Sequence, residues 1–449
     1  MGRLGVVHAL VHGSSLTPVH ALPWTICAFG TRMGHNSVMS DTSTFHVASD
    51  SSVTTRLVQR VQRGHFPWWR RAVICDIGGG VTDEDLEVIE QLSFDFARVG
   101  FTAVAVRPAH ADIAVDGSRL ASFIERVHRT GVKVIVRLSG ARVPGSSEGA
   151  FVNFEQDVSS LVVRTRAALK AGADGIDLGI IREDDEAGEK QASRFTQLIH
   201  ILQAELADFD RMPILAAESS ITTPHALSRH LEEDWFHHLR DDALVTCPWD
   251  INQLRTRIER TLSKRSNLGH VSAWQWSHCP TDNRPVSPVP GSWEEGADHW
   301  RRNAMALVAL SLPGAAYTPF DRLAGRRDFE ASGGPHVEWE SSDNARLERD
   351  MLTRVLRIRV ERSMGSGSLA YVDNLGWAHD GVGVHLCAGV MVVTNTSDSL
   401  VEVPAEHVLL LDSTGRVSDE PNQPTVVGPD QCAWFEAALV QAPPVSSYS

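Results

Sequence analysis

The sequence predicts an α/β protein: a (β/α)8 barrel of the TIM type followed by a small antiparallel β-sandwich. Three observations carry this prediction. From Trp68 onward, short apolar runs typical of buried parallel strands alternate with longer stretches of helical period. Eight such units fit into about 250 residues, which is the usual size of a TIM barrel. Beyond about residue 365, the chain changes to short β-branched runs separated by Gly, Ser, Asn and Asp.

Eight apolar runs are the expected strands of the barrel. In chain order these runs are Ala72–Ile77, Ala103–Arg107, Lys133–Leu138, Gly175–Ile181, Pro213–Glu218, Ala243–Cys247, His270–Trp276 and Ala315–Thr318. An open, doubly wound sheet has the same alternation of strand and helix, so periodicity alone leaves that fold as an alternative. A dinucleotide-binding sheet is disfavoured, because the glycines at 78–80 lack the spacing of a G-x-G-x-x-G turn.

Helix ends can be recognised between several of these runs. Thr82 is the expected N-cap of a helix whose first turn holds three acidic residues, and Gly100 closes that helix. Thr223 and Pro224 form a cap followed by proline at the first helical position. Gly172 lies between a helix and the next strand, as αβ loops prefer. These ends support the repeat of strand and helix.

The C-terminal part has the pattern of antiparallel β structure. Its candidate strands are Ser368–Asp373, Gly383–Leu386, Val390–Thr394, Val401–Val403, Val408–Leu411 and Cys432–Ala438. Short strands with turn residues between them are typical of a sandwich. We therefore divide the chain into an N-terminal extension at 1–67 that is partly disordered, a barrel at 68–365 and a C-terminal β-sandwich domain at 366–449.

The first forty residues differ from the rest of the chain. Residues 1–40 contain no Asp or Glu, and histidines at 8, 12 and 20 interrupt any apolar run. The segment lacks the apolar core and the small-residue cleavage site of a secretory signal peptide. A polar stretch like a natural start begins at Met39, so we expect the residues before it to be a non-native extension or a disordered tail.

Charge and composition exclude several classes of partner. The net charge of −14 offers no broad basic field for nucleic acid. No segment approaches the roughly 20 apolar residues that a membrane-spanning helix needs. The six cysteines are scattered, without a CxxC pair or a disulfide-like spacing, which favours a reducing compartment. We expect a cytoplasmic protein that binds neither nucleic acid nor membrane.

Six short segments, taken in order, resemble the barrel strands of bacterial α-glucosidases. They are WWRRAVICDI from Trp68, GVKVIVRLS from Gly131, GADGIDLG from Gly172, PILAAESS from Pro213, SHC from Ser277 and ALSLPGAAY from Ala309. Together they are similar to the oligo-1,6-glucosidase type of the α-amylase family of glycoside hydrolases. The resemblance runs from about Trp68 to the C-terminus. It implies a barrel, a C-terminal β module and a role in cytoplasmic carbohydrate metabolism.

The resemblance also implies a retaining glycosidase site, most of whose residues are replaced here. Glu218 occupies the position of the general acid/base, but Gly179 stands where the nucleophilic Asp belongs. Asp177 replaces the Arg two residues earlier. Arg137 and Arg142 occupy the positions of a sugar-binding Asp and His. About 30 residues separate Arg142 from Gly172, where the family inserts a larger lobe, so much of that lobe is missing.

The segment after the seventh strand departs in the same way. Cys279 replaces an Asp that grips sugar hydroxyls, and Ser277 replaces an Asn, whereas His278 is retained. The candidate ligand-binding residues are therefore His278, Arg137, Arg142 and Asp76. A metal site of His278 and Cys279 with Cys75 and Cys247 is disfavoured, because cysteine is common in barrel interiors as a small apolar residue. We expect no metal and no cofactor.

Asp177 is the remaining carboxylate that could replace the nucleophile. A retaining glycosidase needs two carboxyl groups about 5–5.5 Å apart. In a regular strand Asp177 shares a face with Gly179 but lies roughly 6.6 Å deeper, too far for attack. We expect Asp177 to pair with Arg137 inside the barrel, because an unpaired buried charge is costly. Alternatively, Arg137 and Arg142 bind an anion such as a sugar phosphate.

Two groups of aromatic and histidine side chains can be explained by packing or by solvent exposure. Trp274 and Trp276 share a strand face, and they could stack on a sugar or fill the barrel. The pair His237 and His238 has the pattern of a solvated surface.

Three functions follow as hypotheses. The favoured one is a non-catalytic pseudoenzyme of carbohydrate metabolism that binds an oligosaccharide, a sugar phosphate or a protein partner. The first alternative is a weak or altered α-glucosidase that uses Glu218 as acid/base with Asp177. The second alternative is a structural subunit of an active paralogous glucosidase.

Overall fold

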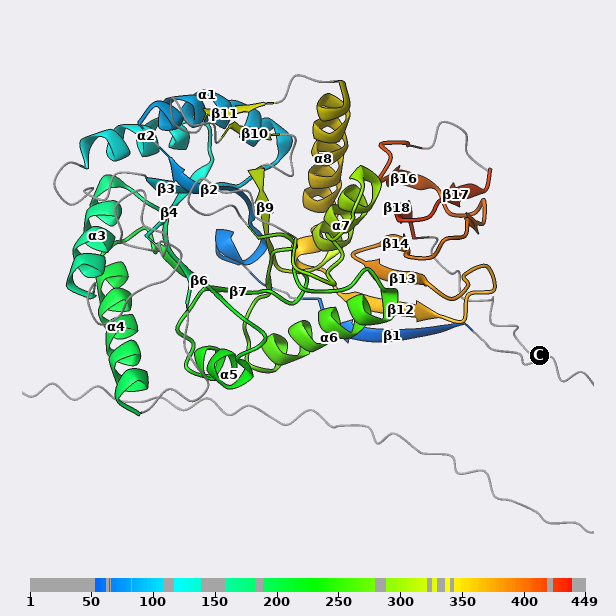
Figure 1. Ribbon diagram of the computed structural model, residues 1–449, viewed down its shortest axis with the longest axis horizontal. Coiled ribbons are helices and arrows are strands. Elements are labelled where there is room, and N and C mark those ends of the chain that lie inside the picture. Colours follow the sequence, from blue (N-terminus) through cyan, green and yellow to red (C-terminus); the bar gives the residue numbers. More distant parts are fainter. Residues whose placement is uncertain are drawn as a thin grey trace, which may run out of the picture. The chain divides into compact units, whose positions relative to one another are not determined.

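The computed structural model describes residues 53–61, 64, 66–81, 83–108, 117–138, 158–181, 189–278, 288–320, 325–328, 336–339, 343–417 and 423–437 (Figure 1). The chain divides into two compact units, Met1–Asp50 and Ser51–Ser449. All of the described residues belong to the second unit. The expected tail before Met39 and the expected N-cap Thr82 therefore lie outside the described residues.

Eight parallel strands close into a barrel in chain order, which confirms the predicted fold class. The strands are β2 (Val73–Val81), β3 (Ala103–Pro108), β4 (Lys133–Arg137), β5 (Gly175–Ile180), β6 (Ile214–Ser219), β7 (His238–Asp241), β8 (Ala273–Trp274) and β9 (Ala315–Pro319). Closure of β2 against β9 excludes the open sheet. Seven of the eight predicted runs overlap these strands.

The prediction for the sixth barrel strand was wrong. The apolar run at 243–247 forms turns, and the strand is β7, which begins five residues earlier. β7 reads HLRD, and all four of its residues are buried. Because the barrel interior at this point holds charged and hydrogen-bonded side chains, the strand lacks the apolar signature on which the prediction rested.

Helices cover the outside of the barrel (Figure 1). They are α1 (Asp83–Val99), α2 (Ser118–His128), α3 (Val158–Ala171), α4 (Glu189–Ala207), α5 (Pro224–Glu232), α6 (Ile251–Asn267), α7 (His299–Ser311) and α8 (Asp343–Glu361). Gly100 closes α1 with φ +113°, as predicted. Pro224 begins α5, but Thr223 makes no side-chain cap bond. No described helix is long and apolar enough to cross a membrane.

Small and branched apolar side chains fill the lower part of the barrel. They include Ile74, Ala105, Ile135 and Ile214, which lie in one buried cluster with Tyr317. The short 3-10 helix η1 (Trp68–Arg71) packs two tryptophans against this cluster. The amino ends of the strands are therefore plugged, and the carboxyl ends hold the polar side chains described below.

The C-terminal sheet is antiparallel, as predicted. Its strand order is β1-β12-β13-β14-β18-β16, and a separate pair, β15-β17, completes the sandwich. The strands are β12 (Leu369–Asp373), β13 (Val382–Cys387), β14 (Val390–Asn395), β15 (Val401–Val403), β16 (Leu409–Asp412), β17 (Thr425–Val427) and β18 (Gln431–Glu436). A two-stranded hairpin, β10 (Gly325–Asp328) and β11 (His336–Trp339), and a 3-10 turn, η3 (Met364–Ser366), complete the described elements.

One strand of this sheet comes from the other end of the chain. β1 (Thr54–Gln59) pairs with β12, although the sequence analysis placed residues 54–59 in the N-terminal extension. Its residues are mostly exposed, so no buried apolar period marked the strand.

The sheet packs tightly on the barrel helices. Arg301 on α7 binds Asp430 at 2.8 Å, and Ser311 lies 2.7 Å from Nε2 of buried His385. On β13, Gly383 faces the side chain of Ile251 so closely that a methyl group there would overlap it. Glycine at 383 is therefore a requirement of close approach between sheet and helix.

We expect Gly383→Ala to lower the free energy of unfolding by about 1–3 kcal/mol, the usual range for overpacking. In an Ile251→Ala background the same substitution should cost little, because the space is then available. Urea unfolding of the four proteins of this cycle measures the coupling. Gly376→Ala is the matched control, since no atom lies within 4 Å of a methyl group there. An equal cost in both backgrounds would contradict this packing.

Candidate site at the carboxyl ends of the barrel strands

Charged side chains gather at the carboxyl ends of the barrel strands. Asp76 on β2, Arg137 on β4, Asp177 on β5 and Arg240 on β7 are all buried. Arg137 on β4 contacts Asp76 on β2, although β3 lies between these two strands, and it also contacts Asp177 on β5. Arg240 on β7 contacts Asp177 on β5, although β6 lies between them. Such contacts are possible only across the barrel interior, so these side chains point inward.

Asp177 is bound on both carboxylate oxygens. Its Oδ2 accepts hydrogen bonds from Arg137 Nε at 3.0 Å and Nη2 at 2.9 Å, which confirms the pairing expected from the sequence. Its Oδ1 accepts from Arg240 Nη2 at 3.0 Å and from the backbone N–H of Gly179 at 2.8 Å. Burial alone would raise the pKa of Asp177, but the two arginines outweigh it and hold the pKa well below its usual range.

The same arginine joins Asp177 to a second aspartate. Arg137 Nη2 donates to Asp76 Oδ2 at 2.6 Å. Asp76 also accepts from the backbone N–H of Gly78 at 3.1 Å, and Gly78 and Gly179 have the same φ of +67°. Each aspartate carboxylate thus accepts a hydrogen bond from the backbone N–H of a left-handed glycine two residues later. Pairing with the neighbouring strand is irregular at both places.

This turn corrects the geometry assumed for position 179. A regular strand through that residue would put its side chain directly above Asp177, but the left-handed glycine and the register shift break the alternation. A side chain at Gly179 would also be strained, because L-residues avoid this φ. The backbone at position 179 is therefore shaped for glycine.

Arg240 and its neighbours were missed by the sequence analysis. The guanidinium lies over the ring of Tyr317, 4.3 Å from its centroid, and two of its nitrogens have no hydrogen-bond partner among the described residues. The Tyr317 hydroxyl lies 2.9 Å from Nδ1 of His238, whose Nε2 lies 2.8 Å from the carbonyl oxygen of Trp69. A buried arginine and histidine in a short strand gave no signal that separates them from surface residues.

His238 is fully buried, so its predicted place on a solvated surface was wrong. Burial lowers the pKa of His238 to about 3, and the nearby Arg240 acts in the same direction. Its neighbour His237 is partly buried, and Nδ1 accepts a hydrogen bond from the N–H of Leu215 at 3.1 Å. Both histidines connect strands of the barrel.

Glu218 is the carboxylate that remains reachable. Its side chain is 14% exposed, and Oε1 lies 3.4 Å from Nδ1 of His278, which is 27% exposed. Burial raises the pKa of Glu218, but its contact with His278 and the charge of Arg240 outweigh this, so the pKa is lowered. Burial lowers the pKa of His278, but Glu218 outweighs it, so that pKa is raised. Both shifts favour an ion pair.

The lowered pKa of Glu218 disfavours the protonated form that acid catalysis needs. A glycosidase acid must carry a proton at neutral pH, and active sites achieve this by raising the carboxyl pKa. Glu218 is shifted the other way. It is suited to accepting hydrogen bonds, and protonated His278 is suited to donating them.

The other residues considered for the site are either buried or outside the described residues. Arg142 and Cys279 lie outside the described residues. Ser277 Oγ lies 3.3 Å from Oε1 of buried Glu294. Cys75 and Cys247 are buried, and burial raises the pKa of both thiols, that of Cys247 to about 12, which disfavours the thiolate that a metal needs. Trp274 and Trp276 are buried and fill space, donating no surface to a ligand.

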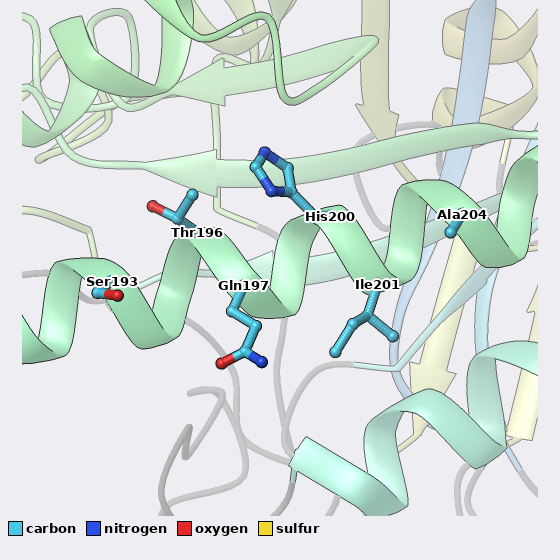
Figure 2. A pocket seen from close by; sticks show the side chains of 6 residues that line it. All are labelled: Ser193, Thr196, Gln197, His200, Ile201 and Ala204. Carbon is cyan, nitrogen blue, oxygen red and sulfur yellow. The ribbon is translucent and has the colours of Figure 1, made fainter.

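A separate hollow lies on the outside of the barrel. Figure 2 shows its lining along one side of α4: Ser193, Thr196, Gln197, His200, Ile201 and Ala204. Its volume is about 670 Å³, and none of the predicted site residues lines it. This hollow is therefore separate from the site formed by Asp76, Arg137, Asp177 and Glu218.

Asp177→Asn should lower the free energy of unfolding by about 3–5 kcal/mol, because it leaves two buried arginines without their shared carboxylate. Urea unfolding near neutral pH measures this loss. Glu205→Gln, which removes an exposed ion pair with Arg166, is the control and should cost less than about 1 kcal/mol. Equal costs for the two variants would refute the role given to Asp177.

His238 should make stability depend on pH. Its pKa is about 3 when folded and about 6.5 when unfolded, so between these values the unfolded chain binds the extra proton. The contribution of His238 to the free energy of unfolding is therefore fully present above about pH 6.5 and is lost as the pH falls below that value. Between pH 7.5 and 5, His238 should account for a loss of about 2 kcal/mol.

Urea unfolding of wild type and His238→Gln at both pH values tests this. The variant should lose less stability on acidification than the wild type does. His385, whose pKa is also lowered to about 3 by burial, contributes to the dependence that remains in both proteins. Identical pH profiles would rule out a buried neutral His238.

Only solved structures are similar to this chain, and they show its fold. No protein-family model matches the sequence, and no curated protein matches it. Among solved structures, the α-amylase from H. orenii is similar with a TM-score of 0.57 at 11% identity, over 82% of this chain and 99% of that one. An isomaltulose synthase variant from Erwinia rhapontici NX5 in complex with D-glucose gives 0.56 at 9%, over 83% and 100%.

A structure described as a family GH13_31 enzyme is also similar, with a TM-score of 0.51 at 10% identity, over 82% of this chain and 99% of that one. At such identities the likeness concerns architecture, which diverges more slowly than active-site chemistry. The fold expected from the six segments is thus confirmed: this chain has the barrel and C-terminal β-sandwich of α-amylase family structures.

Proposed function

We propose that this chain is a carbohydrate-binding member of the α-amylase family that has lost glycosidic cleavage. Support for the family comes from the fold and from the six ordered segments that resemble α-glucosidases. One similar structure, an isomaltulose synthase variant, is a complex with D-glucose. On the same grounds we keep the cytoplasmic location and the division at residues 67 and 365 as parts of this proposal, with β1 added to the C-terminal sheet.

One observation carries the loss of cleavage: the engagement of Asp177. Retaining hydrolysis needs a free carboxylate nucleophile beside a protonated acid. Asp177 is fully buried with both oxygens bonded, and Gly179 has no side chain. Glu218 is shifted toward its ionised form. These contacts weigh against the alternative of a weak α-glucosidase built from Glu218 and Asp177.

The reachable pair, Glu218 and His278, favours a neutral sugar as ligand. A carboxylate and an imidazole side by side offer an acceptor and a donor to neighbouring sugar hydroxyls. A sugar phosphate has less support, because Arg137 is committed to Asp76 and Asp177. A structural subunit of an active paralogue remains the competing proposal, and it requires no sugar at all.

We expect no hydrolysis of an aryl α-glucoside or of maltose above background, with wild type and Glu218→Gln giving equal rates. Gly179→Asp should stay inactive too, because φ at 179 disfavours a side chain. Product release at high enzyme concentration is the measurement. Activity that disappears in Glu218→Gln would overturn the loss of cleavage.

Binding is tested on the same proteins. Maltose, isomaltose and glucose should each be titrated against wild type, and a binding sugar raises the melting temperature. Glu218→Gln should weaken that rise, whereas Glu205→Gln, on the outside of the barrel, should leave it unchanged. No rise with any sugar, together with co-purification of an active glucosidase, would favour the structural subunit.

A further inference from the structure

The two edges of the C-terminal sheet differ in exposure. The sheet ends at β16 on one side and at β1 on the other. On β16, Leu411 and Asp412 are almost fully buried. β1 pairs only with β12 among the described strands, and Thr54 to Leu57 are exposed. An uncovered edge presents unpaired N–H and C=O groups to any strand of suitable sequence.

The two faces of β1 are used differently. Arg56 binds Glu259 on α6 at 2.5 Å and lies over the ring of Tyr371, so its face is anchored to the barrel side. Val53 and Leu57 fall on the other face, four residues apart, and are 57% and 52% exposed. The strand is regular up to Leu57, where a bulge begins.

The edge also lacks the usual protections. Natural edge strands are blocked by proline, by lysine, or by an early bulge. Residues 53–57 read VTTRL, without proline or lysine, and the bulge follows this stretch. The single charge of the stretch, Arg56, is already held by Glu259 on its own chain. Among the described residues, two exposed apolar side chains therefore flank a hydrogen-bonding edge that no strand pairs with.

Residues 53–57 can pair favourably with the same residues of a second copy of the chain. When two copies run antiparallel about a two-fold axis at Thr55, Val53 lies opposite Leu57 of the second copy, and the reverse pair forms by symmetry. Thr55 lies opposite Thr55, and Arg56 lies opposite Thr54. Val53 and Leu57 meet each other, Thr55 meets Thr55, and no like charges lie directly opposite, which are favourable cross-strand combinations. Such self-matching is typical of a two-fold interface.

We propose that β1 is a dimerisation edge, at which two copies of this chain pair their β1 strands antiparallel about Thr55. The two six-stranded sheets then continue into one another. Five paired residues form a small contact, so the dimer should depend on protein concentration. The proposal is independent of any sugar bound at the barrel mouth.

Disulfide trapping tests the register. In the proposed pairing the two Thr55 Cα atoms lie about 4.5–5.5 Å apart, within reach of a disulfide. The two Thr54 Cα atoms are offset by two residues, roughly 8 Å apart, and their side chains point to the other face. Mild oxidation should therefore link Thr55→Cys into a dimer and leave the matched variant Thr54→Cys unlinked. Linking of both to the same extent, or of neither, would overturn the register.

Sedimentation velocity over a wide concentration range tests the dimer itself. Leu57→Lys should weaken dimerisation by about tenfold, because each two-fold interface loses two apolar pairs. Met212→Lys is the control: Met212 is 75% exposed on a loop far along the chain, and the dimer should persist. A wild type that stays monomeric throughout, or a Leu57→Lys protein that dimerises like wild type, would refute the proposal. Far-ultraviolet circular dichroism of each variant excludes unfolding as the cause.

Discussion

The interaction on which the barrel depends is the buried ion network around Asp177. Arg137 joins this carboxylate to Asp76, and Arg240 binds its other oxygen, so β2, β4, β5 and β7 are tied across the interior. Separating charges from water costs several kcal/mol per ion, and the network is stable because nearly every oxygen is bonded. Removing Asp177 leaves buried Arg240 without its carboxylate and Arg137 with Asp76 alone. The carboxyl end of this barrel is thus held together by charge, whereas its amino end is packed with apolar side chains.

The same network explains why the mouth is a weak place for acid–base chemistry. A carboxylate held by two arginines neither attacks carbon nor takes up a proton at neutral pH, since its charged form is strongly favoured. The positive charge of Arg240 also reaches Glu218 and, with His278, favours its ionised form. The network that stabilises the barrel is therefore also the physical basis of the proposed loss of glycosidic cleavage. What survives is a pair of reachable polar groups suited to hydroxyls.

The sequence predicted the strands whose burial on both faces gives them an apolar composition. Seven barrel strands are buried on both faces and read as apolar runs, so their places were predictable. The prediction failed at β7 and β1 for opposite reasons. β7 is buried but polar, because its side chains bond across the barrel, and β1 is a strand but exposed, because it lies at a sheet edge. Neither carries the hydrophobic period on which such predictions depend.

The sequence by itself determined the alternation of barrel strands and helices, the C-terminal β structure, the absence of a side chain at Gly179 and the pairing of Asp177 with Arg137. These follow from local patterns and from the cost of an unpaired buried charge. Only the tertiary structure decided that Arg240 is the second partner of Asp177, that Gly179 is left-handed, and that Glu218 faces His278. Each of these joins residues or conformations that barrel closure brings together, and closure acts over distances in the chain that no local pattern records.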